Sequence, residues 1–180
     1  QFAVAAASSL MEIYPFDQPD VEAAKVKSRE LLTNPSSNIE SGSITESLKT
    51  IASGKSPRYV AVTAYLPESI KLTNAFSALR KAISSQTGMA TTFGYGPRYL
   101  HSTGQLYKGG PQNAFVLGFV SGKHDDLAVP DKGYTFGDLT LAQAGGDFMV
   151  MAAGGQTVLP IHLGDNPIEE LIGATLELFE

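Results

Sequence analysis

The stretch Arg58-Tyr-Val-Ala-Val-Thr-Ala-Tyr65 decides the fold, because its run of apolar and β-branched residues is typical of a strand buried in a parallel sheet. Apolar residues at helical spacing follow it, and the order of strand and helix then recurs to the end of the chain. Alternating strands and helices predict an α/β fold: a doubly wound, mostly parallel sheet with helices on both faces, in three layers. The further strands are predicted at residues 89–94, 114–120 and 157–163, and the further helices at 136–153 and 166–178.

The residues before this region are expected to form helices. Residues 1–14 are helix-like, and prolines at positions 15 and 19 interrupt them. Asp20 is predicted to be the N-cap of a second helix, from Val21 to about Leu32. The apolar start of the chain lacks the initiating methionine and the basic region of a signal peptide, so we interpret it as a helix cut out of a longer chain.

A polar segment separates these helices from the alternating region. Residues 33–54 are rich in Ser, Asn, Thr and Gly and are predicted to be a linker, with one short amphipathic piece near Ile44–Ile51. We therefore divide the chain into N-terminal helices with a linker, residues 1–57, and an α/β domain, residues 58–180, which together make one compact unit.

The composition excludes several classes of partner. The chain has 180 residues, of which 43% are hydrophobic and 17% charged, as in an ordinary soluble domain. Its net charge of −5 argues against nucleic acid and anionic membranes, because both select basic surfaces. The chain has no cysteine, which excludes disulfides and thiolate zinc sites and fits a reducing compartment. We expect a cytoplasmic protein that uses no metal and no cofactor.

The candidate site is Phe93-Gly-Tyr-Gly-Pro-Arg-Tyr-Leu-His-Ser-Thr-Gly-Gln-Leu-Tyr-Lys-Gly-Gly-Pro111, which we call the polar loop. It leads from a strand through a glycine-rich turn into a dense group of polar side chains: His101, Ser102, Thr103, Gln105 and Lys108. Glycine lets a backbone approach a ligand closely. Ligands of doubly wound sheets bind beyond the carboxyl ends of the strands, so we expect the loop there, with Ser102 or Thr103 near a helix N-terminus. Composition alone fits a polar surface loop equally well.

Two segments resemble phosphoglucose isomerase. His101-Ser-Thr-Gly-Gln-Leu-Tyr-Lys-Gly-Gly110 is similar to that family's G-Q-H-S-F-Y-Q-L-I-H-Q-G motif, which puts His101 on the catalytic histidine and Gln105 on the glutamine. Phe16-Asp-Gln-Pro-Asp-Val-Glu-Ala-Ala-Lys25 is similar to its F-D-Q-W-G-V-E-L-G-K signature, which puts Lys25 on the catalytic lysine. The stretch from Arg98, together with Lys108-Gly-Gly-Pro111, resembles most closely the C-terminal portion of bifunctional transaldolase/phosphoglucose isomerase fusions.

The resemblance implies a sugar-isomerase (SIS-type), Rossmann-like domain that helps interconvert glucose 6-phosphate and fructose 6-phosphate. His101 and Lys25 would assist opening of the hexose ring and would face each other across one cleft. An imidazole titrates near working pH, and an ammonium stabilises developing negative charge. The residues expected to bind substrate are Arg98, Ser102, Thr103, Gln105 and Lys108. The implied partners are the sugar phosphate, upstream isomerase and transaldolase domains of the same chain, and a second copy in a homo-oligomer.

The sequence departs from the family in three ways. The lysine motif precedes the histidine motif, as in a circular permutation. The family's proton-transfer glutamate, in an E-S-N-G context before the histidine strand, is matched only by Ile83-Ser-Ser-Gln-Thr-Gly88, which has no carboxylate. The phosphate-binding Ser/Thr loop and the G-G-R segment have no counterpart. A non-catalytic sugar-phosphate-binding module and a purely structural domain therefore stay open as alternatives.

Four other groups have simpler interpretations. His162 in an apolar strand is expected to be structural. His124 with its two following aspartates is predicted to lie in a solvated turn rather than at a metal. Asp147 is assigned to a helix surface, with lining of the cleft as the alternative. Glu22 stands three residues before Lys25, so a weak surface ion pair competes with a catalytic role for this lysine.

Overall fold

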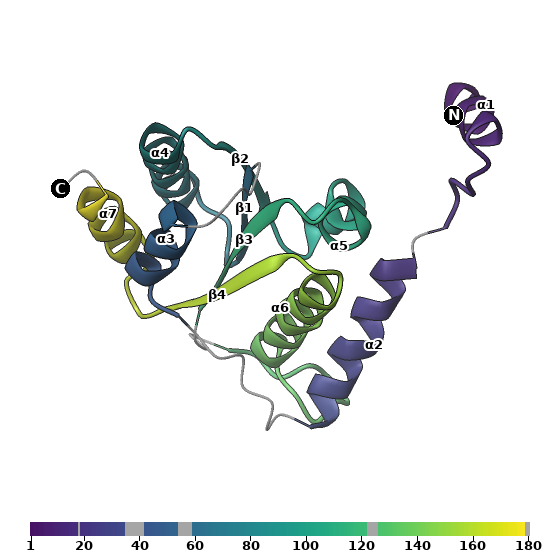
Figure 1. The fold of residues 1–180 in the computed structure, drawn as a ribbon. Helices are drawn as coiled ribbons and strands as arrows, with labels where there is room; N and C mark the ends of the chain where they lie inside the picture. The colour runs from purple at the N-terminus through teal and green to yellow at the C-terminus, as the bar shows by residue number, and fades with distance from the viewer. Residues whose placement is uncertain (18, 35–41, 54–58, 122–125, 179–180) are drawn as a thin grey trace.

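The core of the molecule is a four-stranded, all-parallel sheet with strand order β2-β1-β3-β4 (Figure 1). The computed structural model describes residues 1–17, 19–34, 42–53, 59–121 and 126–178. The predicted α/β sheet is confirmed, and Pro160 lies in an edge strand, where its missing N–H donor is tolerated. The strands are β1 (Tyr59–Tyr65), β2 (Ala90–Tyr95), β3 (Ala114–Ser121) and β4 (Thr157–Leu163).

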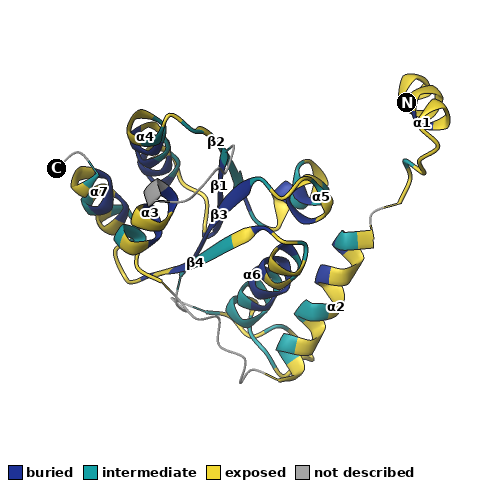
Figure 2. Cartoon of the chain, viewed as in Figure 1, coloured by how far each residue is buried: buried dark blue, intermediate teal, exposed yellow. Residues whose placement is uncertain are grey.

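Helices cover both faces of this sheet. One face packs against α3 (Ile44–Ser53), α4 (Ile70–Thr87) and α7 (Pro167–Glu177). The other face packs against the short 3-10 turn η1 (Arg98–His101), α5 (Gly104–Gly109) and α6 (Phe136–Ala153), with α2 (Pro19–Thr33) outside α6. β1 and β3 are almost wholly buried between the two layers, as their apolar runs predict (Figure 2).

The helix starts follow from local sequence. Ser69 caps α4 by accepting a hydrogen bond from the Leu72 N–H, and Thr135 caps α6 in a reciprocal capping box with Asp138. Asn166 and Pro167 begin α7 as predicted, although the Asn166 side chain makes no capping bond. These three helix N-termini all lie at the carboxyl edge of the sheet, because each helix follows a strand in the chain.

The segment predicted to be a linker contributes to the core. α3 spans the amphipathic piece within it, and its Leu48 and Ile51 side chains are buried in the cluster that also contains α4 and α7. The Ser- and Asn-rich flanks dominate the composition of residues 33–54, and they mask a helix of which only one face is apolar. Residues 35–41 and 54–58, which flank α3, lie outside the described residues. The proposed division at residue 57 therefore separates α3 from the layer into which it packs.

α2 begins two residues earlier than predicted, at Pro19, so Asp20 lies inside the helix and is not its N-cap. Proline is well suited to the first helical turn because it needs no N–H partner there. α2 packs along α6 at Gly146, where an added Cβ would overlap the Ser28 side chain and the Ala24 carbonyl. Two helices lie this close because Gly146 has no side chain.

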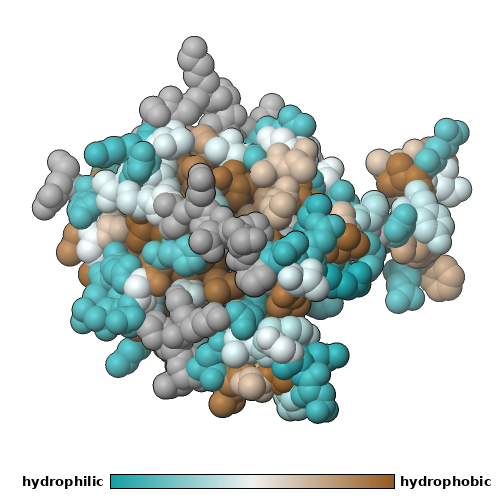
Figure 3. Space-filling model, turned by 90° about the horizontal axis from the view of Figure 1, so that it is seen from below, coloured by the Kyte–Doolittle hydropathy of each residue, from teal (hydrophilic) through white to brown (hydrophobic). Residues whose placement is uncertain are grey.

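α1 (Phe2–Leu10) stands apart from the sheet and its helices (Figures 1 and 3). Its Phe2 and Leu10 side chains are almost fully exposed. The helix at the start of the chain is thus confirmed as a helix, and it takes no part in either core cluster. Among the described helices, none combines the length and apolar character that a membrane crossing requires.

Candidate functional site

A cavity of about 790 Å³ opens at the carboxyl edge of the sheet. It lies beyond the ends of the neighbouring strands β1 and β3, because the chain leaves β1 toward β2 on one side of the sheet and leaves β3 toward β4 on the other. Ligands of open parallel sheets bind in this crevice. Residues from the ends of all four strands or their following loops reach it: Tyr65, Gly96, Ser121 and Asp165.

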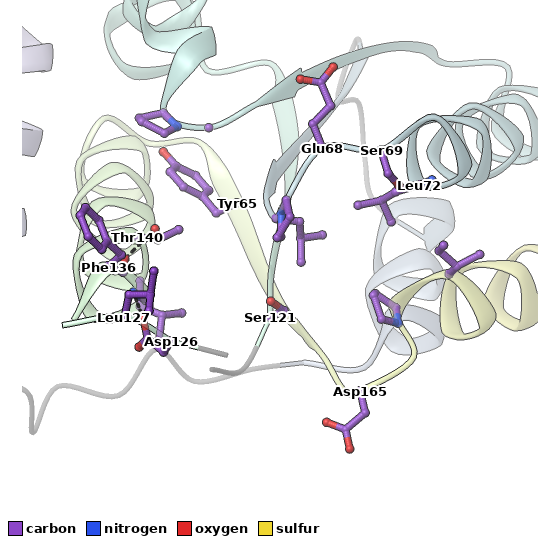
Figure 4. A pocket seen from close by; sticks show the side chains of 18 residues that line it. Tyr65, Glu68, Ser69, Leu72, Ser121, Asp126, Leu127, Phe136, Thr140 and Asp165 are labelled. Atoms are coloured by element: carbon purple, nitrogen blue, oxygen red, sulfur yellow. Dashed lines mark hydrogen bonds between the residues drawn. The ribbon is translucent and has the colours of Figure 1, made fainter. Parts of the chain in front are cut away.

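The cavity walls come from opposite layers of the fold. Phe136 and Thr140 of α6 form one side and Leu72 of α4 the other, with Ser121 of β3 between them (Figure 4). Apolar side chains also gather toward the middle of the molecule in the view of Figure 3. The ionisable groups in the described lining are a tyrosine and the carboxylates Glu68, Asp126 and Asp165. A ligand here would meet apolar walls, hydroxyls and carboxylates.

Of His124, Asp125 and Asp126, only Asp126 is among the described residues, and it lines the cavity. Asp126 accepts a hydrogen bond from the Gly137 N–H, in the first turn of α6, at 2.8 Å. A carboxylate at a helix N-terminus is favoured by the helix dipole. Within the described part of the chain, no group of His, Asp and Glu side chains could hold a metal ion.

The polar loop lies where the sequence predicts, beyond the carboxyl end of β2. The turn that carries the histidine, η1, follows β2 directly, and we call it the His101 turn. His101 and Ser102 are exposed, and Thr103 is half-buried at the start of α5 without making a side-chain cap. Arg98 forms an ion pair of 2.8 Å with Glu68, which lines the cavity. The described cavity lining itself includes Gly96 and Pro97 of the loop but not His101.

Lys25 lies on α2 with its side chain 54% exposed, and its ammonium pairs with Glu22 at 2.5 Å. The hydrogen bond and charge of Lys25 lower the pKa of Glu22. The surface pair that competes with a catalytic role is therefore present in the structure. An exposed pair of this kind contributes little to stability, so Lys25 can exchange Glu22 for another anion at small cost.

The structure brings the two motif segments together, although 85 positions separate the joining residues. Gln105 Nε2 of the polar loop donates to Asp20 Oδ2 of α2 at 2.5 Å. Gly109 packs against the same carboxylate so closely that an added Cβ would overlap it. The Gln105 Oε1 atom is buried and has no hydrogen-bond partner among the described residues. A buried acceptor without a hydrogen bond costs free energy. A ligand hydroxyl that reached the Gln105 Oε1 atom could donate the missing hydrogen bond.

Lys108 is predicted to bind substrate, but its side chain is fully buried and pairs with Asp147 at 2.6 Å. Asp147, assigned from the sequence to a helix surface, is 1% exposed. Asp147 Oδ2 also accepts hydrogen bonds from the Tyr65 and Tyr99 hydroxyls. Burial first, and the neighbouring charge second, raise the pKa of Tyr99 well above its usual value, so this hydroxyl stays protonated and donates. We call these four residues the buried ionic cluster.

Sequence reasoning missed Glu68. The segment Ile83–Gly88, where a carboxylate is expected by family resemblance, ends α4 and precedes β2, so it lies at the opposite edge of the sheet from the cavity. Glu68 follows β1 at the carboxyl edge, lines the cavity and pairs with the His101 turn. Glu68 could have been found from its position in the sequence. It precedes the strand that leads to His101, and a serine follows it, as in the family's E-S-N-G context.

His162 lies on the edge strand β4 with its side chain exposed, away from the buried face of the sheet. Its neighbours in the strand, Ile161 and Leu163, are buried, as the alternation along a strand requires. The apolar pattern that suggested a structural histidine therefore describes the flanking residues, which are buried, and not the His162 side chain, which is exposed.

The chain matches no family model and no curated protein. Among solved structures, the crystal structure of a hypothetical protein from Thermus thermophilus superposes with a TM-score of 0.56 and 19% sequence identity. The match covers 68% of this chain and 35% of the other, so the chain spans about a third of that protein's length. At this identity the likeness shows a shared fold.

Proposed function

We propose that this chain is the C-terminal part of a glucose-6-phosphate isomerase that interconverts glucose 6-phosphate and fructose 6-phosphate, in a larger protein that also carries a transaldolase. The observation that carries the proposal is the contact between Gln105 and Asp20, which joins the two segments that resemble separate parts of one isomerase site. Chance resemblances far apart in the sequence have no reason to meet in space.

The chemistry assigned to these segments is opening of the hexose ring. His101, which is exposed on its turn, gives and takes the proton of the ring oxygen as a general acid and base. Lys25 stabilises negative charge that develops as the ring opens, after exchanging its weak partner Glu22 for substrate. Gln105, Ser102 and Thr103 supply hydrogen-bonding groups to the sugar hydroxyls.

Glu68 is the proposed base that moves a proton between the first two carbons of the open sugar. It lines the cavity, and its ion pair with Arg98 ties it to the His101 turn. In an isomerisation through an enediol, the carboxylate takes the proton from one carbon and returns it to the next, so the substrate gains and loses no electrons overall. Arg98 orients the carboxylate and takes part in substrate binding.

A sugar-phosphate-binding module without chemistry is the second candidate. The observation that favours it is that Ile83–Gly88, where the family's proton-transfer glutamate is expected, has no carboxylate and lies at the opposite edge of the sheet from the cavity. If this chain only binds, its ligand groups still include Gln105, whose carbonyl oxygen has no partner among the described residues.

The two candidates are separated by assaying the complete protein for conversion of fructose 6-phosphate to glucose 6-phosphate, with a dehydrogenase reporting the product. We expect turnover by the parent protein and a loss of roughly 10²- to 10⁴-fold in kcat for Glu68→Gln, the range associated with a positioned acid or base. The matched control is Glu30→Gln, because Glu30 is also an exposed carboxylate in an ion pair, at 2.8 Å from Lys27.

Binding of fructose 6-phosphate without turnover by the complete protein would favour the binding module and reject the isomerase. Turnover that survives Glu68→Gln would keep the isomerase but move the base elsewhere. Incorporation of solvent deuterium at the second carbon of the sugar gives an independent measure of the proton-transfer step, and we expect it to be lost in Glu68→Gln alone.

A further inference from the structure

The buried ionic cluster joins four elements of the fold. Asp147 projects from α6, Lys108 from α5 and Tyr65 from the end of β1, while Tyr99 belongs to the His101 turn. All four side chains are buried, and Tyr65 also lines the cavity. One carboxylate therefore touches the cavity wall and the turn that carries the histidine.

Tyr99 connects this carboxylate to the backbone of the His101 turn. Its hydroxyl donates to Asp147 Oδ2 at 2.9 Å, and its ring packs against Tyr107. Its carbonyl accepts from the N–H groups of Ser102 and Thr103, at 3.0 and 2.9 Å. The side chain of Tyr99 is thus fixed to the core, and its main chain fixes the residues that immediately follow His101.

Stability alone is a weak reason for such an arrangement. Taking a lysine and an aspartate out of water costs free energy that their attraction repays only in favourable geometry, and apolar residues of similar volume often stabilise a core as well or better. The Asp147 carboxylate accepts from donor groups on three elements. Because these contacts are directional, they fix the orientation of each donor side chain, which apolar packing does not do.

We propose that Asp147 is a positioning residue that holds the His101 turn through Tyr99, with Lys108 orienting the carboxylate through its other oxygen, Oδ1. Lys108 then serves the site from within the core and does not touch substrate. This proposal rests on the proposed function for its catalytic consequence. Its structural consequence, the fixing of the turn, can be measured separately.

The test compares Tyr99→Phe with Tyr107→Phe in the complete protein. Each change removes one buried hydroxyl and keeps the ring: Tyr99 loses its bond to Asp147, and Tyr107 loses its bond of 2.9 Å to Thr92. Amide hydrogen exchange at Thr103 reports opening of the turn, and exchange at Leu79, inside α4, reports opening of the core. A merely structural role would accelerate both amides to a similar degree.

We expect Tyr99→Phe to accelerate exchange at Thr103 by roughly 10- to 100-fold relative to Leu79, as loss of a bond to a charged acceptor predicts. Fructose 6-phosphate turnover should fall in kcat by about tenfold or more, with KM nearly unchanged, because a misplaced histidine affects reaction more than binding. Tyr107→Phe should do neither.

Equal acceleration of Thr103 and Leu79 in Tyr99→Phe would overturn the proposal, and so would a freed turn with unchanged kcat. If the parent protein has no isomerase activity, the proposed function fails, and the exchange measurement still decides whether Asp147 fixes the turn. If kcat falls equally in both tyrosine variants, the effect belongs to general packing around α5, and the positioning role is rejected.

Discussion

The contact between Asp147 and Lys108 changes the role assigned to each residue. Both lie in the interior, and each is the other's partner at 2.6 Å. Lys108 Nζ makes no further hydrogen bond among the described residues, so the ion pair is its main compensation for lost solvent. The sequence offers a lysine in a polar loop and an aspartate after two glycines, and nothing in either pattern indicates that the two residues meet inside the fold.

We predict that Lys108→Met destabilises the protein by about 3–5 kcal/mol, because it leaves the Asp147 carboxylate buried without its counter-charge. The double variant Lys108→Met/Asp147→Asn should recover much of the loss, since the amide is uncharged and still accepts from the two tyrosine hydroxyls. Urea denaturation followed by circular dichroism measures both.

The control for this pair is Lys81→Met, on the exposed side of α4, which should change the free energy of unfolding by less than about 0.5 kcal/mol. A Lys108→Met protein as stable as the parent would mean that the ammonium is not paired in the interior. It would restore the sequence-based prediction that Lys108 reaches substrate.

At the scale of elements, the contact between α2 and α6 holds the lysine-bearing helix against the α/β layers. Gly146 faces Ala24 and Ser28 across this contact, and the Ser28 hydroxyl is already bonded to the Ala24 carbonyl. A carbon atom added at Gly146 would therefore force the two helices apart. The position of Lys25 relative to the sheet therefore depends on a glycine of α6.

Gly146→Ala is expected to destabilise the protein by about 1–3 kcal/mol, because the new methyl group would meet backbone that cannot rotate away. Gly173→Ala is the matched change in α7, where an added Cβ has no neighbour within 4 Å. It should instead stabilise by about 0.5–1 kcal/mol through helix propensity. Thermal unfolding of the two variants checks both signs, and equal effects would contradict the close contact of α2 with α6.

Much of the fold could be predicted at this scale. The strands over residues 114–120 and 157–163 and the helix over residues 136–153 match the structure closely, because each has a clear hydrophobic period and turn residues at its ends. α3 could not be identified as a core element, since only its buried partners reveal what Leu48 and Ile51 pack against. Glu68 could not be found from the spacing of a motif, because the cavity depends on which ends of the strands lie together.

At the scale of the whole molecule, the parallel sheet gathers the candidate groups at one edge. The cavity, Glu68 and the His101 turn all lie beyond the carboxyl ends of the strands, and the contact between Gln105 and Asp20 adds the lysine-bearing helix to the polar loop. The fold thus places near each other segments that the sequence separates, which is the physical basis for treating them as one site.

The most direct test of a single isomerase site is a double-mutant cycle on His101 and Lys25 in the complete protein, with kcat/KM for fructose 6-phosphate as the readout. Residues that assist the same ring-opening step are not independent, so we predict that His101→Ala/Lys25→Ala is far less impaired than the product of the two single losses. Losses that multiply, or a Lys25→Ala protein with full activity, would contradict the account.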